Sequence, residues 1–215
     1  GPAPETATPE TASPETASPE EDQLDDRDYR RLRPIAELAG APLASKPGVF
    51  GWDKIDAGSA FLADNLDQIY PRLASSKPQV LDLGCGYGYL SVRVWEQGAS
   101  SILATDNNAA AVGCCQYNFA ARQIQGEVVA DDCAAGIRDR FDLVICNPPF
   151  HQGFSVEGEL TDRFLATAAR LLKNDGQAAF VVNRFIPLER KARGLFADVE
   201  CFADNGSFKL IRLAG

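Results

Sequence analysis

The chain has 215 residues, which is enough for one or two domains. Charged residues make up 24% of it and hydrophobic residues 45%, as in ordinary globular proteins. No apolar run approaches the ~18 residues of a membrane span, and no secretory leader is visible, which argues against membrane and secreted proteins. Nine acids and one arginine give residues 1–28 a net charge of −8, whereas residues 29–215 carry only −1. The charge of the folded part therefore neither favours nor excludes a nucleic-acid partner.

The N-terminal tail is a near-repeat with the sequence PETAT PETAS PETAS PEEDQ. This composition buries too little apolar surface to offset the entropy of ordering, so we expect residues 1–28 to be a disordered acidic linker or tail. We interpret the leading Gly-Pro as the scar of a removed tag, and we expect the linker to join an N-terminal domain that this chain lacks. Residues 29–47 are then a lead-in segment, and residues 48–215 are the main folded domain.

From residue 79 onward, strand-like and helix-like stretches alternate along the chain. Five apolar runs predict strands at residues 79–83, 101–105, 127–130, 141–146 and 177–183. Helices are predicted at residues 90–96, 108–122, 160–172 and 187–195. Two last strands, 199–202 and 208–213, would form a hairpin around Asp204-Asn205-Gly206. Such alternation predicts a doubly wound, mostly parallel α/β sheet, whose ligands bind at the carboxyl ends of the strands.

The first predicted strand runs into the sequence DLGCGYG, in which Asp82 precedes Gly84 and Gly86. Glycines two residues apart let the backbone turn tightly and approach a ligand closely. The glycine spacing is GxGxG, whereas the fingerprint of dinucleotide-binding proteins is GxGxxG. That fingerprint binds a pyrophosphate, and the acidic Asp82 is badly placed for such a negatively charged group. Asp82 suits a ligand with an ammonium group instead. The alternative is a glycine-rich turn without a ligand.

Acidic residues also follow the second and third predicted strands. Asp106, after the second, can accept both hydroxyls of a ribose, as acids at this position do in nucleotide-binding sheets. Asn107 or Asn108 would cap the helix that follows. Asp131 or Asp132, after the third strand, can accept a hydrogen bond from an adenine amino group, and a solvated turn is the alternative.

The fourth predicted strand leads into Asn147-Pro148-Pro149-Phe150, the most informative segment of the chain. The two prolines fix the backbone and remove two N–H donors, which leaves the Asn147 side-chain oxygen and a peptide carbonyl as acceptors. Two acceptors that converge on a planar amine can hold it in line with an electrophile. An aromatic neighbour can stack on the base that carries this amine.

The chain has six cysteines and one histidine, His151. No two cysteines form a C-x-x-C pair, and a single histidine makes a zinc site of the usual spacing improbable, so we expect no metal. Because free thiols persist in a reducing compartment, we expect a cytoplasmic protein.

Together, DLGCGYG, Asp106 and NPPF resemble the motifs of class I S-adenosylmethionine (SAM) methyltransferases that act on amino nitrogens. The stretches GVFGWDKIDAGSAFL, VVNRFIP and SFKLIRL resemble the C-terminal catalytic domain of ribosomal RNA guanine-N2 methyltransferases, of the small subunit methyltransferase C and large subunit methyltransferase G groups. The resemblance covers about residues 45–215. It implies a Rossmann-like, doubly wound sheet of seven mostly parallel strands with an antiparallel last strand.

The resemblance also implies a cofactor site. Its residues would be Phe50, Asp82, Gly84, Gly86, Asp106, Asn107, Asp131, Asp132 and Asn147. The glycines and Asp82 would surround the amino-acid part of SAM, Asp106 would hold its ribose, and one of the two later aspartates its adenine. Phe50 and residues 56–59 would close over the cofactor from the N-terminal side, where Ser59 is alternatively only a helix N-cap.

The implied catalytic residues are Asn147 and the Pro148 carbonyl, which would hold the guanine amine, and Phe150, which would lie against the base. His151 either touches the substrate or is a satisfied histidine at the rim. The expected reaction is methyl transfer from SAM to the N2 amine of a guanine in 16S or 23S rRNA, free or in a ribosomal subunit, with S-adenosylhomocysteine as product. Positioning supplies most of the rate, and no covalent nucleophile is needed.

Two alternatives stay open at this point. The first is a methyltransferase with another amino acceptor, either adenine N6 or a protein glutamine amide. The second is a non-catalytic module with a SAM-binding fold that serves as an RNA-binding partner. Phe150 and His151 favour the guanine group, and the intact glycine loop argues against the non-catalytic module.

Overall fold

The computed structural model describes Gly1, residues 27–149 and residues 154–215. Its elements follow in chain order as α1 (Arg27–Arg30), β1 (Arg33–Leu38), β2 (Ala41–Ser45), α2 (Ala57–Asp64), β3 (Gln79–Leu83), α3 (Tyr89–Glu96), β4 (Ser101–Asp106), α4 (Ala109–Arg122), β5 (Gly126–Ala130), β6 (Phe141–Cys146), α5 (Phe154–Leu171), β7 (Leu172–Asn183), α6 (Leu188–Ala192), β8 (Asp198–Asp204) and β9 (Phe208–Ala214). Two short 3-10 turns, Leu66–Gln68 and Tyr70–Arg72, precede β3.

Seven strands form one sheet in the order β5-β4-β3-β6-β7-β9-β8. Neighbouring strands from β5 to β7 are parallel, and β9 runs antiparallel to both β7 and β8. The predicted fold, a mostly parallel seven-stranded sheet with an antiparallel last strand, is confirmed. The strand order changes direction at β3, whose two neighbours are β4 and β6. A crevice for ligands is expected at the carboxyl ends of the strands around this switch point.

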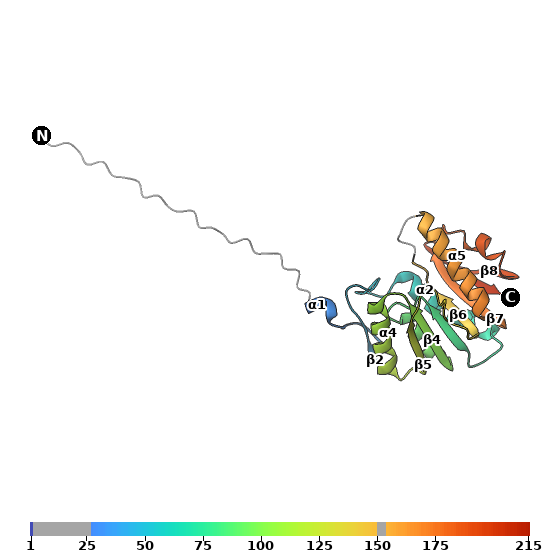
Figure 1. The fold of residues 1–215 in the computed structure, drawn as a ribbon, viewed down its shortest axis with the longest axis horizontal. Helices are drawn as coiled ribbons and strands as arrows, with labels where there is room; N and C mark the ends of the chain where they lie inside the picture. Colours follow the sequence, from blue (N-terminus) through green and yellow to red (C-terminus); the bar gives the residue numbers. More distant parts are fainter. Residues whose placement is uncertain (2–26, 150–153) are drawn as a thin grey trace.

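Helices cover the sheet on both faces. Val80 packs in a core with residues of α2, α3 and α4, whereas its neighbour Leu81 packs in a second core with residues of α5 and α6. Both side chains are fully buried. A central strand that is buried on both faces requires a continuous apolar run, which explains why β3 and β6 were visible in the sequence. Figure 1 shows α4 beside β4 and β5, and α5 beside the later strands.

The lead-in segment contains a hairpin of β1 and β2 that the sequence analysis did not anticipate. Five of the eleven residues in its strands are proline or alanine, and neither favours strand structure. Hydrogen bonds from α4 hold it instead. The Asn118 side chain accepts from Ala44 N at 2.9 Å and donates to the carbonyl oxygens of Ala44 and Tyr87, both at 2.8 Å. Arg122 donates to Leu38 O at 3.0 Å. The hairpin is thereby tied to the loop that follows β3.

Several element bounds differ from the prediction. The strand predicted at 177–183 begins at Leu172, because Leu172 pairs with Phe141 before the chain reaches a turn-like Asn-Asp-Gly stretch. The helix predicted at 160–172 spans Phe154–Leu171, and the one predicted at 187–195 is only Leu188–Ala192. The predicted terminal hairpin of β8 and β9 is confirmed. In the described part of the chain, no helix combines the length and the apolar character needed to cross a membrane.

Candidate active site

A cavity of about 740 Å³ opens at the carboxyl ends of the parallel strands. It is lined by residues that follow β3 to β7, by the segment before α2 and by part of α5. Nine of the predicted site residues line it: Phe50, Gly84, Gly86, Asp106, Asn107, Asp131, Asp132, Asn147 and Pro148. Asp82 does not. Phe150 and His151 lie outside the described residues.

The glycine loop after β3 is held by backbone hydrogen bonds to the end of β4. Gly84 N and Cys85 N both donate to Thr105 O at 2.9 Å, and all three loop glycines have positive φ angles, from 55° at Gly86 to 89° at Gly88. A Cβ atom added to Gly88 would lie 2.7 Å from the Sγ atom of Cys115. The loop can therefore turn this tightly only with glycines.

Asp106 is fixed at the cavity by two backbone donors. Its Oδ2 atom accepts from Gly86 N at 2.9 Å, and its Oδ1 atom accepts from Asn108 N at 2.8 Å. Asn108 is the N-cap of α4, since its Oδ1 atom accepts from Ala110 N at 2.9 Å. Of the two asparagines proposed as the cap, Asn108 has this role, and Asn107 lines the cavity. Each carboxylate oxygen of Asp106 has a further lone pair for a hydroxyl donor.

Asp82 lies beneath the glycine loop, 1% exposed, where its Oδ2 atom accepts from Ser91 Oγ at 2.6 Å. Burial raises the pKa of Asp82 to about 7, the Ser91 hydrogen bond opposes this shift, and the negative charge of Asp106 adds slightly to it. Asp82 therefore supports the loop from below and does not line the cavity.

The pKa of Asp82 predicts a pH-dependent stability. Its folded-state pKa of about 7 exceeds the usual value of 3.8, so the folded state binds the extra proton between these two values. This group stabilises the folded state fully below pH ~4, and its contribution is lost as the pH rises to ~7. The unfolding free energy should fall by roughly 4 kcal/mol over this range because of this group. Asp82→Asn should flatten this part of the profile of unfolding free energy measured in urea. Asp67→Asn, at an exposed position, serves as the control, and equal profiles for wild type and Asp82→Asn would contradict the prediction.

The two aspartates after β5 have different partners. Asp131 accepts from Ala135 N at 2.7 Å and from Gly136 N at 3.0 Å, which closes the turn after the strand. Asp132 pairs with Arg163 of α5 at 2.6 Å, and this hydrogen bond lowers the pKa of Asp132. Both residues line the cavity, so the geometry leaves either carboxylate available to an amino group there.

Asn147 is anchored by two side chains from the N-terminal part of the chain. Its Nδ2 atom donates to Asp56 Oδ2 and to Ser59 Oγ, both at 2.8 Å. Asp56 Oδ2 also accepts a hydrogen bond from Ser59 N at 2.8 Å, so the residue Asp56 is the N-cap of α2. The alternative role of Ser59 as the N-cap is therefore wrong. Because both N–H groups of the amide are engaged, the amide is oriented with its oxygen as an acceptor.

The sequence analysis missed several residues at the β7 side of the cavity. Asn183, Phe185, Ile186 and Phe208 line it, and Phe185 is 87% exposed. The stretch VVNRFIP supported the resemblance, but it assigned no task to these side chains. An aromatic residue two positions after a predicted strand end is a signal that could have identified Phe185.

The site offers no metal centre and no activated thiol within the described ranges. No group of three or more histidine, cysteine, aspartate or glutamate side chains there is placed to hold a metal ion. Cys146 directly precedes Asn147, but burial raises the pKa of its thiol, so it is protonated and unreactive at neutral pH. The arrangement is therefore suited to binding and orienting ligands.

Comparison with known proteins extends these observations. Residues 40–212 match the family model described as the methyltransferase small domain. A small subunit methyltransferase C of ribosomal RNA from Erwinia tasmaniensis is 35% identical over 180 residues, which are 83% of this chain and 50% of that protein. Its counterpart from Haemophilus influenzae (strain PittGG) is 31% identical over 185 residues, which are 86% and 54% of the two chains. The chain thus spans about half the length of these curated relatives.

Solved structures show the same architecture. The 16S rRNA N2 G1207 methyltransferase (RsmC) of T. thermophilus, solved in complex with AdoMet and guanosine, superposes with a TM-score of 0.73 at 26% identity, over 86% of this chain and 50% of that one. A ribosomal protein L11 methylase from Lactobacillus delbrueckii subsp. bulgaricus reaches 0.61 at 20% identity, over 75% and 83% of the two chains, which shows the fold alone. Since the family match extends from β2 to β9 and includes every strand of the seven-stranded sheet, the chain belongs to the methyltransferase small domain family.

Proposed function

We propose that this protein transfers a methyl group from SAM to the exocyclic N2 amine of a guanine in 16S ribosomal RNA. The observation that carries the proposal is the oriented amide of Asn147, which presents an acceptor for an N–H group in a cavity that it shares with Asp106 and the glycine loop. The relatives named small subunit methyltransferase C favour rRNA of the small subunit over that of the large subunit. We also propose a cytoplasmic location, where ribosomal RNA is found.

The residues of the cavity fit SAM. SAM has a ribose diol, an adenine and an amino-acid group, and the wall formed by the ends of β3, β4 and β5 has polar groups for each. We propose that Asp106, beside Asn107, binds the ribose and that Asp131 or Asp132 binds the adenine amine.

The remaining predicted positions complete the proposed cofactor site. The backbone of Gly84 and Gly86 would face the amino-acid group, with Asp82 supporting the loop from below through Ser91. Phe50 would cover the cofactor, because Asn108 Nδ2 donates to Gly48 O at 2.8 Å and holds the preceding segment beside the end of β4. When bound, SAM would supply an electrophilic methyl carbon on a positively charged sulfur; the sulfur would leave as the thioether of S-adenosylhomocysteine, and the methylated amine would release one N–H proton to water.

The protein's own part in the reaction is to hold the amine. A guanine amine is a weak nucleophile because its lone pair delocalises into the ring. We propose that Asn147 Oδ1 and the Pro148 carbonyl accept hydrogen bonds from its two N–H groups, which raises electron density on nitrogen and aims the lone pair. Phe150, which lies outside the described residues, would contact the base. Asp56 and Ser59 keep the amide of Asn147 in this orientation.

Asp106→Ala should weaken SAM binding by about 1–3 kcal/mol, because a charged acceptor of the ribose hydroxyls and the support of Gly86 N are lost together. Isothermal titration calorimetry measures this difference. Asp67→Ala, which removes an exposed carboxylate far from the glycine loop, is the matched control. Unchanged affinity in Asp106→Ala would remove this residue from the cofactor site.

The function itself is tested by methyl transfer from labelled SAM. The substrates are free 16S and 23S rRNA and both ribosomal subunits, taken from cells that lack the corresponding gene, and the products are identified by nucleoside mass spectrometry. N2-methylguanosine on 16S rRNA or on the small subunit is the expected product. N6-methyladenosine, or a product on 23S rRNA, would refute the proposed acceptor.

The matched part of this chain corresponds to only about half the length of the curated relatives. Most of the expected disordered tail of residues 1–28 lies outside the described residues, and its last two residues, Arg27 and Asp28, belong to the helix α1. We propose that this tail acts as a linker to a further N-terminal domain and that residues 48–215 form the SAM-dependent methyltransferase domain. RNA substrates should then be compared between this chain and a longer form that includes such a domain. Transfer to rRNA by the longer form alone would assign RNA binding to the additional domain.

A further inference from the structure

Phe185 is an apolar side chain that contributes almost nothing to the packing of the protein. It is 87% exposed, more than any other large hydrophobic residue in the described part of the chain. It nevertheless lines the cavity, two residues after the carboxyl end of β7. Exposing an aromatic ring to water is unfavourable, and single exposed rings at the edge of a cavity are frequently used for recognition.

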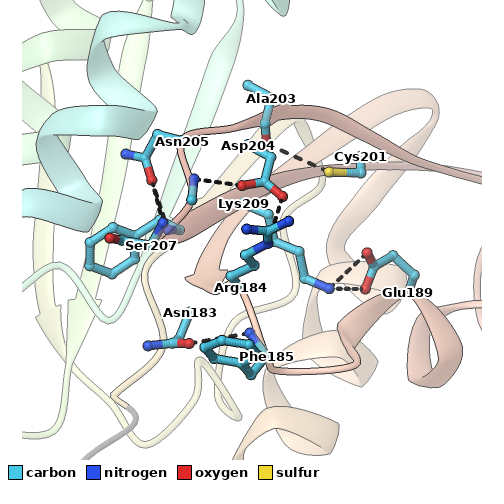
Figure 2. Close-up of polar contacts among 12 residues, drawn as sticks. Asn183, Arg184, Phe185, Glu189, Cys201, Ala203, Asp204, Asn205, Ser207 and Lys209 are labelled. Atoms are coloured by element: carbon cyan, nitrogen blue, oxygen red, sulfur yellow. Dashed lines mark hydrogen bonds and ion pairs between the residues drawn. The ribbon is translucent and has the colours of Figure 1, made fainter.

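The loop that carries Phe185 is fixed by hydrogen bonds of its backbone N–H groups, of which Figure 2 shows the one between Asn183 and Phe185. Phe185 N donates to Asn183 Oδ1 at 3.2 Å, and Ile186 N donates to Asn183 O at 3.0 Å. Arg184 N donates to Ser207 O at 2.9 Å, which joins the loop to the β8–β9 turn. The ring is therefore presented from a supported backbone.

The same loop is supported by two ion pairs, which Figure 2 also includes. Arg184 Nε lies 3.3 Å from Asp204 Oδ2, at the end of β8. Lys209 Nζ lies 2.6 Å from Glu189 Oε2 and connects β9 to α6. These contacts tie the β7–α6 connection to the terminal hairpin, so Phe185 is held in place although its ring is exposed.

The order of the strands divides the cavity into two sides. The ends of β4 and β5 contribute carboxylates and amides, such as Asp106 and Asp131. The end of β7 and the start of β9 contribute one amide, that of Asn183, and three apolar side chains, those of Phe185, Ile186 and Phe208. Asn147, at the end of β6, stands between the two sides. The polar side fits the ribose and the adenine of SAM, which leaves the aromatic side for the molecule whose amine Asn147 holds.

We propose that Phe185 is a stacking platform for the target nucleobase, which lies against the ring while its amine reaches Asn147. The inference rests on the proposed function, because it needs an acceptor amine on a planar heterocycle. A base removed from its helix loses stacking on both faces, and an exposed aromatic ring restores it on one of them.

The test uses 2-aminopurine riboside, whose exocyclic 2-amino group matches that of guanosine and whose fluorescence is quenched by stacking. It is titrated with saturating S-adenosylhomocysteine into wild type, Phe185→Tyr, Phe185→Leu and Phe185→Ala. We expect quenching in wild type and Phe185→Tyr and its loss in the other two variants. Leucine keeps apolar bulk without a π face, so it separates stacking from hydrophobic covering. In steady-state assays, KM for RNA should rise roughly tenfold in the leucine and alanine variants.

Several outcomes overturn the inference. Full quenching with Phe185→Leu and Phe185→Ala would mean that the ring does not touch the base. A fall in SAM affinity in all three variants would mean that Phe185 belongs to the cofactor site. A fall in the unfolding free energy of the variants, measured in this chain or in a longer form, would mean that Phe185 is a packing residue. Product formation by wild type is measured first. Absence of N2-methylguanosine with both this chain and a longer form refutes the proposed function, whereas normal product with equal KM values refutes only the role of Phe185.

Discussion

Replacing Asn147 with alanine should abolish methyl transfer and leave the affinity for SAM nearly unchanged. The amide oxygen is assigned to the acceptor amine, whereas the cofactor is assigned to groups on β3, β4 and β5. Removing one preorganised polar group from an active site typically costs about 10²–10³ in kcat, and here the partners of the amide are disturbed as well. Asp56 and Ser59 each lose a donor at 2.8 Å when the amide is removed. We therefore expect a loss of at least about 10³-fold.

The measurement is single-turnover methyl transfer at saturating SAM, with SAM affinity determined separately by calorimetry. Asn174→Ala is the matched control, because Asn174 is exposed and lies at the start of β7, away from the carboxyl ends of the strands. A large loss of SAM binding in Asn147→Ala would contradict the assignment to the amine. Normal transfer would contradict the proposed mechanism itself.

Asp56→Ala should lower kcat by about 10²-fold through a residue that does not touch the reacting atoms. Asp56 Oδ2 accepts from Asn147 Nδ2, so its removal frees the amide to rotate. A misplacement of about 1 Å in a positioning group is sufficient for a loss of this size. Asp56 is therefore a positioning residue, and its effect should appear in kcat and not in the affinity for SAM.

Asp56 also caps α2, and the two roles must be separated. Loss of an N-cap costs about 1 kcal/mol of unfolding free energy. Asp56→Ser should restore most of this stability, because a serine hydroxyl can accept from Ser59 N, yet it is too short to reach Asn147 and should stay slow. Asp56→Asn should keep both contacts, since one carbonyl oxygen can replace Oδ2 for both donors. Equal kcat values for Asp56→Ser and wild type would reduce Asp56 to a helix cap.

Ser59→Ala offers an independent check on the same arrangement. It removes the second acceptor of Asn147 Nδ2 and leaves the cap at Asp56 in place. Its decrease in kcat should be smaller than that of Asp56→Ala, because the charged acceptor remains.

The strands and the order of the site motifs were readable from the sequence for local reasons. The central strands β3 and β6 are buried on both faces, so they appear as continuous apolar runs such as QVLDL and FDLVIC. Glycine is required where φ is positive, so the loop after β3 is visible as GxGxG. Parallel strands end at one edge, which brings Asp106 and Asn147 to one cavity although 41 positions separate them in the sequence.

Only the tertiary structure decided which of these residues face the cavity and which partners hold them. Asp82 belongs to the glycine motif but is buried under it, because its side chain alternates away from the cavity and binds Ser91. The anchoring of Asn147 by Asp56 joins residues 91 positions apart, and no local pattern encodes such a contact. The β1–β2 hairpin is held by hydrogen bonds from α4 and by the burial of residues such as Leu43 in the core, and the propensities of its strands do not reveal these contacts. Periodicity and turn chemistry are local properties that a sequence displays directly, whereas exposure and side-chain partnership arise only when distant segments pack together.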